Sequence, residues 1–169
     1  MCAQFSPLGR LCEPSKGEVG TAMSTEGRTV TRSEGRIRFE DFELQQLPDN
    51  RCSARVVLAW HSGDEYVGTA EGEDSLQGQL RSAAEATAHA LEAAANGRVG
   101  LTVLTVKALE TFETVLVIVS LSGSVDHRSE RLVGSCLIKD SAARGAALAV
   151  LSATNRLLGI YFASLAADH

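Results

Sequence analysis

Two copies of an Asp-Ser pair are the residues of this sequence that are best placed to bind a ligand. Asp74-Ser75 and Asp140-Ser141 each stand directly before a long alanine-rich segment with helical spacing. The aspartates are good helix N-caps, Gln77 completes a capping box in the first copy, and capping alone explains these residues. Two helix N-termini that face one cleft would also offer free N–H groups to a carboxylate. This second hypothesis predicts a ligand site formed by Gly72, Asp74, Ser75, Gly134, Asp140 and Ser141.

Residue patterns that perform catalysis or hold a metal are missing from the sequence. It has no His-Glu-x-x-His, no Walker loop and no Gly-x-Ser-x-Gly, and its spacing places no nucleophile beside a base. The four cysteines include no Cys-x-x-Cys pair, which argues against a zinc site. Cys136 is typical of a small buried apolar group, and the acidic run over 65–74 is typical of a solvated surface. We therefore predict no catalytic residue, no metal, no cofactor and no enzymatic activity.

The segments that carry the two Asp-Ser pairs form an internal repeat. A shift of 66 positions superposes Gly68 on Gly134 and Asp74 on Asp140. A shift of 60 superposes the apolar residues 56–59 on 116–119, and we interpret the difference of six as a longer hairpin loop in the second copy. A repeat of this length indicates two similar units, each too small to bury its own core.

The first unit has the pattern of three strands and a helix. Alternating apolar residues begin at Ile37 and change phase around Asp41, which indicates a β-bulge. Further strands are predicted over 56–60 and 65–70, and a helix over 75–95 that ends at Asn96-Gly97 in a left-handed cap. The predicted inner face of that helix consists of Leu76, Leu80, Ala83, Ala84, Thr87, Leu91 and Ala94.

The second unit repeats this order. Strands are predicted over 101–107, 114–121 and 132–138, and the nearly continuous apolar strand 114–121 should be central. Residues 122–130 are predicted to form a charged loop, and a second helix to run over 141–158 and to close at Gly159. The apolar stretch 160–165 either continues the helix or packs on a partner.

These elements predict an α+β fold, a two-layer sandwich built from a duplicated β-β-β-α unit. The duplicated domain covers 36–160, with units 36–97 and 98–160, and 161–169 is a C-terminal extension. Residues 1–35 lack periodicity and are predicted to be disordered, and Met23 is a candidate translation start. Because the opposite faces of the sheets or helices must also be covered, a homodimer is expected.

Composition excludes several classes of partner. The net charge is −5, with 16 basic against 21 acidic residues, and aromatic residues make up 5% of the 169 positions, which argues against binding nucleic acid. The sequence has no secretory signal and no apolar run of about 18 residues, so no membrane association is expected. The scattered cysteines are consistent with a reduced, cytoplasmic protein.

The doubled layout resembles the C-terminal regulatory domain of the 2-isopropylmalate synthase and citramalate synthase family. The likeness covers roughly 36–160 and is carried by the Gly134-Ser135 strand, the Asp140-Ser141-Ala142-Ala143 turn and the Asn155-Arg156 pair near the end of an alanine-rich helix. The first copy has Gly72-Glu73-Asp74-Ser75-Leu76 where the family has Gly-Pro-Val-Asp-Ala. The resemblance implies a freestanding allosteric domain that binds an end-product amino acid at a dimer interface, without the catalytic barrel.

Two functions follow from these observations. The first is a non-catalytic regulatory module that dimerises and binds a small carboxylate or amino acid between the helix N-termini. The alternative is a structural or adaptor protein that engages a partner protein through its sheet face and its apolar C-terminal segment.

Overall fold

The computed structural model describes residues 37–60, 63–125 and 128–167. The predicted disorder of 1–35 and the candidate start at Met23 lie outside these residues. No helix within the described ranges is long and apolar enough to cross a membrane.

The chain forms two three-stranded antiparallel sheets, each followed by a helix. The first repeat contains β1 (Arg38–Leu47), β2 (Arg51–Ala59), β3 (Glu65–Glu73) and α1 (Leu76–Ala94). The second contains β4 (Val99–Thr111), β5 (Thr114–Val125), β6 (Arg128–Ile138) and α2 (Ala142–Ala167). Strand order is β1-β2-β3 in one sheet and β4-β5-β6 in the other, so the strand predicted to be central is central. The predicted α+β fold of two β-β-β-α units is confirmed.

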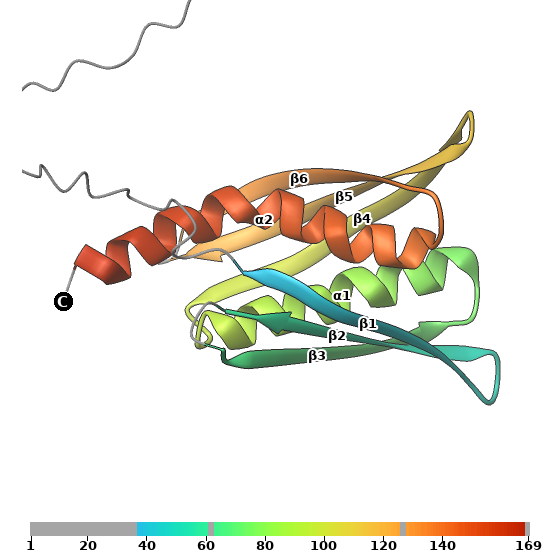
Figure 1. The fold of residues 1–169 in the computed structure, drawn as a ribbon, viewed down its shortest axis with the longest axis horizontal. Helices are drawn as coiled ribbons and strands as arrows, with labels where there is room; N and C mark the ends of the chain where they lie inside the picture. Colours follow the sequence, from blue (N-terminus) through green and yellow to red (C-terminus); the bar gives the residue numbers. More distant parts are fainter. Residues whose placement is uncertain (1–36, 61–62, 126–127, 168–169) are drawn as a thin grey trace, which may run out of the picture. The chain divides into compact units, whose positions relative to one another are not determined.

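Each helix covers one face of its own sheet and thereby forms a two-layer unit. Both helices begin at the same end of the repeat pair, on the right in Figure 1, and they pack against each other. α1 also lies along the edge strand β4, where the Gln77 amide donates to the carbonyl of Val106 at 2.9 Å. Farther along α1, the Glu92 carboxylate accepts the N–H of Leu101 at 2.6 Å. A single hydrophobic cluster joins the two repeats.

The glycines that the repeat superposes mark the closest contact between helix and sheet. A Cβ on Gly68 would meet the carbonyl oxygen of Ala86 at 1.9 Å, and one on Gly134 would meet that of Ala149 at 2.1 Å. Only glycine allows the helix backbone to approach the strand this closely. The alanines of both helices serve the same packing, because larger side chains would hold the layers apart.

The predicted bulge is confirmed, and it occurs in both repeats. The register of β1 with β2 shifts between Phe39 and Asp41, which makes Glu40 the bulged residue. The register of β4 with β5 shifts between Val103 and Thr105, which makes Leu104 its counterpart.

The predicted alignment of the central strands is wrong. Val56 pairs with Gly68 and Val119 pairs with Gly134, so β2 corresponds to β5 after a shift of 63 positions rather than 60. An error of three residues exchanges the two faces of a strand, because side chains alternate along it. The predicted charged loop over 122–130 is also wrong, since the β5–β6 ladder continues until Val125 pairs with Arg128.

The helix ends confirm some predictions and correct others. Thr87 is fully buried and its hydroxyl donates to the carbonyl of Ala83 at 2.8 Å. Asn96 and Gly97 both have positive φ, as a left-handed cap requires. Leu76, however, is 63% exposed and does not belong to the inner face of α1. α2 continues past Gly159 to Ala167, so the stretch 160–165 extends the helix.

Candidate functional site

Asp74 does not cap α1. It forms hydrogen bonds with the neighbouring elements instead. Its N–H donates to the carbonyl of Asn50 at 2.8 Å, and its carboxylate accepts from the side-chain amides of Gln46 at 2.8 Å and Gln79 at 2.6 Å. These bonds tie the start of α1 to the β1–β2 hairpin. The N-cap of α1 is instead Ser75, one residue later than predicted.

The two serines of the repeated pair occupy equivalent positions in the two helices. The hydroxyl of Ser75 accepts the N–H of Gly78 at 3.1 Å, and that of Ser141 accepts the N–H of Arg144 at 3.3 Å. Each hydroxyl therefore satisfies its own helix. Gly134 faces α2 at the close contact described above, so the helix covers it.

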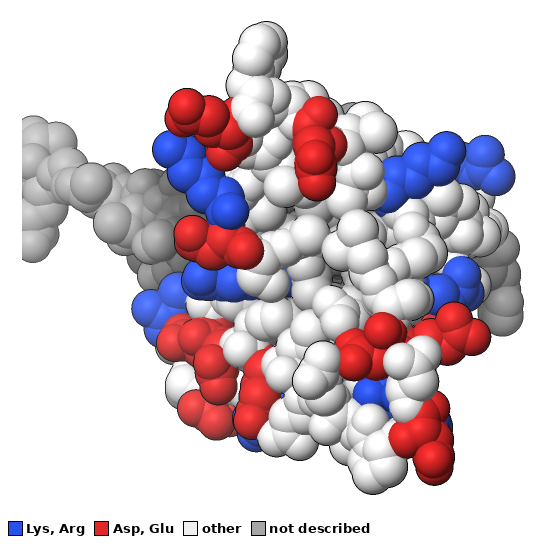
Figure 2. Space-filling model, turned by 90° about the vertical axis from the view of Figure 1, so that its right-hand side faces the viewer, with Lys and Arg blue, Asp and Glu red and all other residues white. Residues whose placement is uncertain are grey.

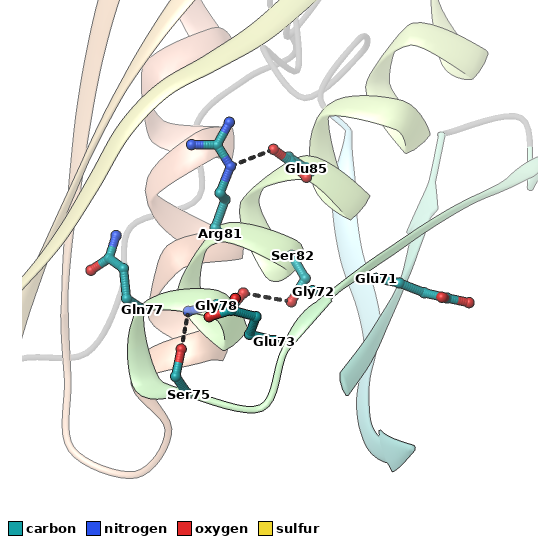
Figure 3. Close-up of a pocket in the computed structure, with 9 residues that line it drawn as sticks. All are labelled: Glu71, Gly72, Glu73, Ser75, Gln77, Gly78, Arg81, Ser82 and Glu85. Atoms are coloured by element: carbon teal, nitrogen blue, oxygen red, sulfur yellow. Dashed lines mark hydrogen bonds and ion pairs between the residues drawn. The ribbon is translucent and has the colours of Figure 1, made fainter. Parts of the chain in front are cut away.

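Two of the six predicted ligand residues, Gly72 and Ser75, line a common groove (Figure 3). The groove has a volume of about 370 Å³, and its described lining comes from β3, α1 and the N-cap Ser75 between them. The lining residues are Glu71, Gly72, Glu73, Ser75, Gln77, Gly78, Arg81, Ser82 and Glu85. The predicted residues Gly134, Asp140 and Ser141 belong to the second repeat and do not line it.

The charges of the groove disfavour the carboxylate ligand that the helix N-termini suggested. Its lining carries three glutamates and one arginine, and the guanidinium of Arg81 is paired with Glu85 at 2.8 Å. Glu71 points away from α1 in Figure 3 and pairs with Arg51 on the neighbouring strand. The remaining negative charge suits a cation better than an anion.

The two described cysteines are not activated for chemistry. Cys52 is fully buried and its thiol donates to the carbonyl of Glu73 at 3.2 Å. Burial raises the pKa of Cys136, against a smaller lowering by the Arg144 guanidinium. A raised pKa reduces the fraction of the reactive thiolate at neutral pH. Within the described ranges, no group of three or more His, Cys, Asp or Glu residues is placed to hold a metal ion.

A second candidate site is the face of the second sheet that points away from α2, where apolar side chains are exposed. Leu109, Leu116 and Leu137 are directly opposite one another and form a row of leucines across all three strands. Leu109 is 47% exposed and Leu137 is 65% exposed, and Leu116 lies outside the core cluster. We call the apolar residues of this outward surface the leucine face: Leu104, Leu109, Leu116, Ile118, Val133 and Leu137.

The first sheet shows that its architecture does not require these leucines. By the ladder registers, the positions of Leu109, Leu116 and Leu137 correspond to Gln45, Ser53 and Glu71. Likewise Ile118 corresponds to Arg55, and the bulged Leu104 corresponds to the bulged Glu40. Among the six residues of the leucine face, Val133 is the exception, because its counterpart in the first sheet is also a valine, Val67. The fold therefore tolerates polar side chains at these positions, and the apolar ones call for another explanation.

The outward faces of the two sheets also differ in charge. The charged residues at outward positions of β4–β6 are Lys107 and Arg131, both on edge strands. The charged residues at outward positions of β1–β3 are more numerous and mostly acidic: Glu40, Asp41, Glu43, Glu65, Glu71 and Glu73, with Arg38, Arg51 and Arg55 among them. Figure 2 views the end of the repeat pair where the helices begin, and acidic groups appear there in the lower part, on the side of β1–β3, as well as at the upper left.

Phe112 stands at the turn between β4 and β5, next to the leucine face. Its side chain is fully exposed and its φ is +53°. Such a conformation favours glycine and is unusual for a bulky residue. The hairpin that carries it reaches beyond the neighbouring elements, at the upper right of Figure 1.

The sequence contained a signal for the leucine face. Leu116, Val117, Ile118 and Val119 are consecutive, so both faces of this central strand are apolar. One apolar face packs on α2, and the other forms part of the leucine face. Sequence reasoning did indicate a sheet face as a partner surface, but the misaligned repeat hid which residues form it.

Comparison with known protein families finds no family model that matches the chain, and comparison with curated proteins finds no matching relative. The resemblance to the regulatory domain of 2-isopropylmalate synthase thus depends on the motifs quoted above and stays a prediction.

Proposed function

We propose that the protein is a non-catalytic dimerisation module in which the leucine face of one copy packs on the leucine face of a second. The observation that carries this proposal is the replacement, at matched positions of the repeat, of polar residues in the first sheet by apolar residues in the second. Exposed apolar area that the fold does not need is typical of an interaction surface.

The chemistry of the face suits a second copy of the chain. A closed twofold contact needs one patch that complements itself, and apolar side chains meet that condition without a matching charge. Lys107 and Arg131 lie on the edge strands, so their charges would stay at the rim in water. Two sheets that pack face to face lie about 10 Å apart with interdigitating side chains. Full burial of a leucine or valine side chain contributes about 1.5–3 kcal/mol.

The test transfers the residues of the first sheet onto the second. The triple variant Leu109→Gln, Leu116→Ser, Leu137→Glu gives the leucine row the side chains of its counterpart. We expect a dimeric mass for the parent chain and a monomeric mass for the variant by light scattering, with unchanged far-UV circular dichroism. The matched control is Val67→Ser on the first sheet, which should stay dimeric. A triple variant that keeps the parent's mass would refute the leucine face as the interface.

The groove of Figure 3 supports a second candidate function, the binding of a small ligand. Its glutamates favour a molecule with an ammonium group, and a ligand that stabilised one dimer arrangement would couple to assembly by about 1–3 kcal/mol. The test is thermal unfolding with amino acids, simple amines and carboxylates. We expect stabilisation by the first two groups and none by the carboxylates, and Glu73→Gln should abolish it. Equal shifts from all three would contradict a specific site.

A further inference from the structure

We infer that the twofold axis of this dimer runs across the strands at Leu116, so that Phe112 of each copy packs on the partner's Leu104 and the partner's Val133. The inference depends on the dimer proposed above, and it specifies which residues meet.

The first step is the position of Phe112 along the sheet. Phe112 precedes Leu116 by four residues and Ser120 follows it by four, so each lies up to about 13 Å from Leu116 in opposite directions. Ser120 pairs with Thr105 on one side and with Val133 on the other, and Leu104 is the bulged residue beside Thr105. The turn that carries Phe112 and the row that contains Ser120 and Val133 are therefore at similar distances from the middle of the leucine row.

The second step is the symmetry operation. Face-to-face packing of identical sheets requires a twofold axis that lies in the plane between them. An axis across the strands through Leu116 keeps the strand order and reverses the strand direction. Phe112 then lies over the row that contains the partner's Ser120, and the leucine row lies over its own copy.

The third step is what this arrangement covers. Val133 is 63% exposed and Leu104 is 39% exposed in the single chain, and the small Ser120 lies between their strands. The side chain of Phe112 is fully exposed, so the described residues of its own chain do not cover it. The arrangement brings these exposed apolar groups together. It also places Lys107, which lies two residues from the leucine row, over the hydroxyl of the partner's Thr111 instead of an apolar group.

The unusual backbone conformation of Phe112 supports a role for its side chain as an anchor in the contact between the two copies. A residue with φ of +53° at a two-residue turn is ordinarily a glycine. Among the residues that the structure describes, no packing contact compensates for a phenylalanine there. Contact with a second copy would supply the compensation, because the exposed ring is free to pack on it.

An axis parallel to the strands is the competing arrangement. It would place Leu109 over the partner's Leu137 and would move Phe112 to the hairpin end of the partner. The two arrangements therefore predict different pairs of neighbouring residues, and cross-linking distinguishes them.

The experiment uses the full chain with Cys2, Cys12 and Cys136 replaced by serine and the buried Cys52 retained. Chains with Phe112→Cys are mixed with tagged chains carrying Leu104→Cys and treated with a short bis-maleimide. Because each chain carries one introduced thiol, the tagged heterodimer band reports contact between copies alone. We expect this band to be at least tenfold stronger than that from a mixture of Leu109→Cys and Leu137→Cys chains. The control is the cysteine-replaced background without an introduced thiol, which retains only the buried Cys52 and should give no band.

The outcomes separate the two proposals. A band from the Leu109→Cys and Leu137→Cys mixture, with none from the Phe112→Cys and Leu104→Cys mixture, would overturn the axis and leave the leucine face as the interface. A parent chain that is monomeric by light scattering would overturn both.

Discussion

The two repeats have the same internal construction and different outward faces. Both contain a bulge in the first strand, a central apolar strand and a glycine pressed against the helix backbone. On the outside, Gln45, Ser53 and Glu71 of one sheet stand where the other has three leucines. The shared features are those that the fold requires, and the features that differ are free to serve an interaction. The first sheet thus acts as an internal control for the second.

The largest effect is expected where the repeats agree. Gly68→Ala and Gly134→Ala each place a methyl group within about 2 Å of a helix carbonyl oxygen, so the helix must move. We expect each change to lower the free energy of unfolding by about 3 kcal/mol, at the upper end for overpacking. The matched control is Gly159→Ala, where a Cβ meets nothing within 4 Å. Urea denaturation measures all three, and a mild effect at either repeat glycine would contradict the shared construction.

The next prediction removes the difference between the outward faces. The triple variant Gln45→Leu, Ser53→Leu, Glu71→Leu gives the first sheet a leucine row. Each copy then has two adhesive faces and can bind two neighbours, so we expect masses beyond the dimer by light scattering. The loss of Glu71 from its exposed pair with Arg51 should cost less than about 1 kcal/mol. The polar triple variant Gln45→Ser, Ser53→Thr, Glu71→Gln is the control and should stay dimeric. An unchanged mass for the leucine variant would show that a leucine row alone is not adhesive.

Local sequence signals were sufficient to predict the element order. Strands and helices follow apolar periods that are read over a few residues, and the bulge near Asp41 and the cap at Asn96-Gly97 have equally local signatures. The cap of α1 was missed because Asp74 and Ser75 are both good N-caps. The choice between them depends on Gln46 and Asn50, which approach Asp74 only in the folded chain.

The leucine face could not be assigned from the sequence for a different reason. An apolar residue on a central strand has the same pattern whether it packs on a helix or on a second molecule. Only the ladder register shows that Val117 faces α2 while Leu116 and Ile118 face away from it. The predicted ligand site could not be assigned either, because it depends on which residues the fold brings together. Gly72 and Ser75 line the same groove, but the predicted residues of the second repeat do not.

A change at Phe112 is expected to have two smaller effects of opposite sign, one on the stability of the monomer and one on the stability of the dimer. Phe112→Gly relieves the left-handed conformation and should raise the free energy of unfolding of the monomer by up to about 1 kcal/mol. The same change removes the proposed anchor and should raise the dimer dissociation constant about tenfold, which corresponds to about 1.4 kcal/mol. Urea denaturation in the background of the monomeric triple variant measures the first, and sedimentation equilibrium measures the second. The control is Asn50→Gly, a residue with φ of +55° in the corresponding turn of the first repeat, which should leave the dissociation constant unchanged. A Phe112→Gly dimer as tight as the parent would exclude the anchor.

The smallest effect concerns the inner faces, where Cys136 of β6 corresponds to Ala70 of β3. Because burial raises the pKa of this thiol in the folded chain, unfolding releases a proton once the pH exceeds the thiol's ordinary value of 9.0. The stability from this group is therefore complete below pH 9 and declines as the pH rises toward the folded pKa. Cys136→Ala copies the first repeat and should make the loss of stability between pH 8 and 10 slightly shallower, as measured by urea midpoints. Arg144→Gln removes the charge that opposes the shift and should move the alkylation midpoint of Cys136 to still higher pH. An alkylation midpoint at or below that of the unfolded chain would contradict the burial of this thiol beneath α2.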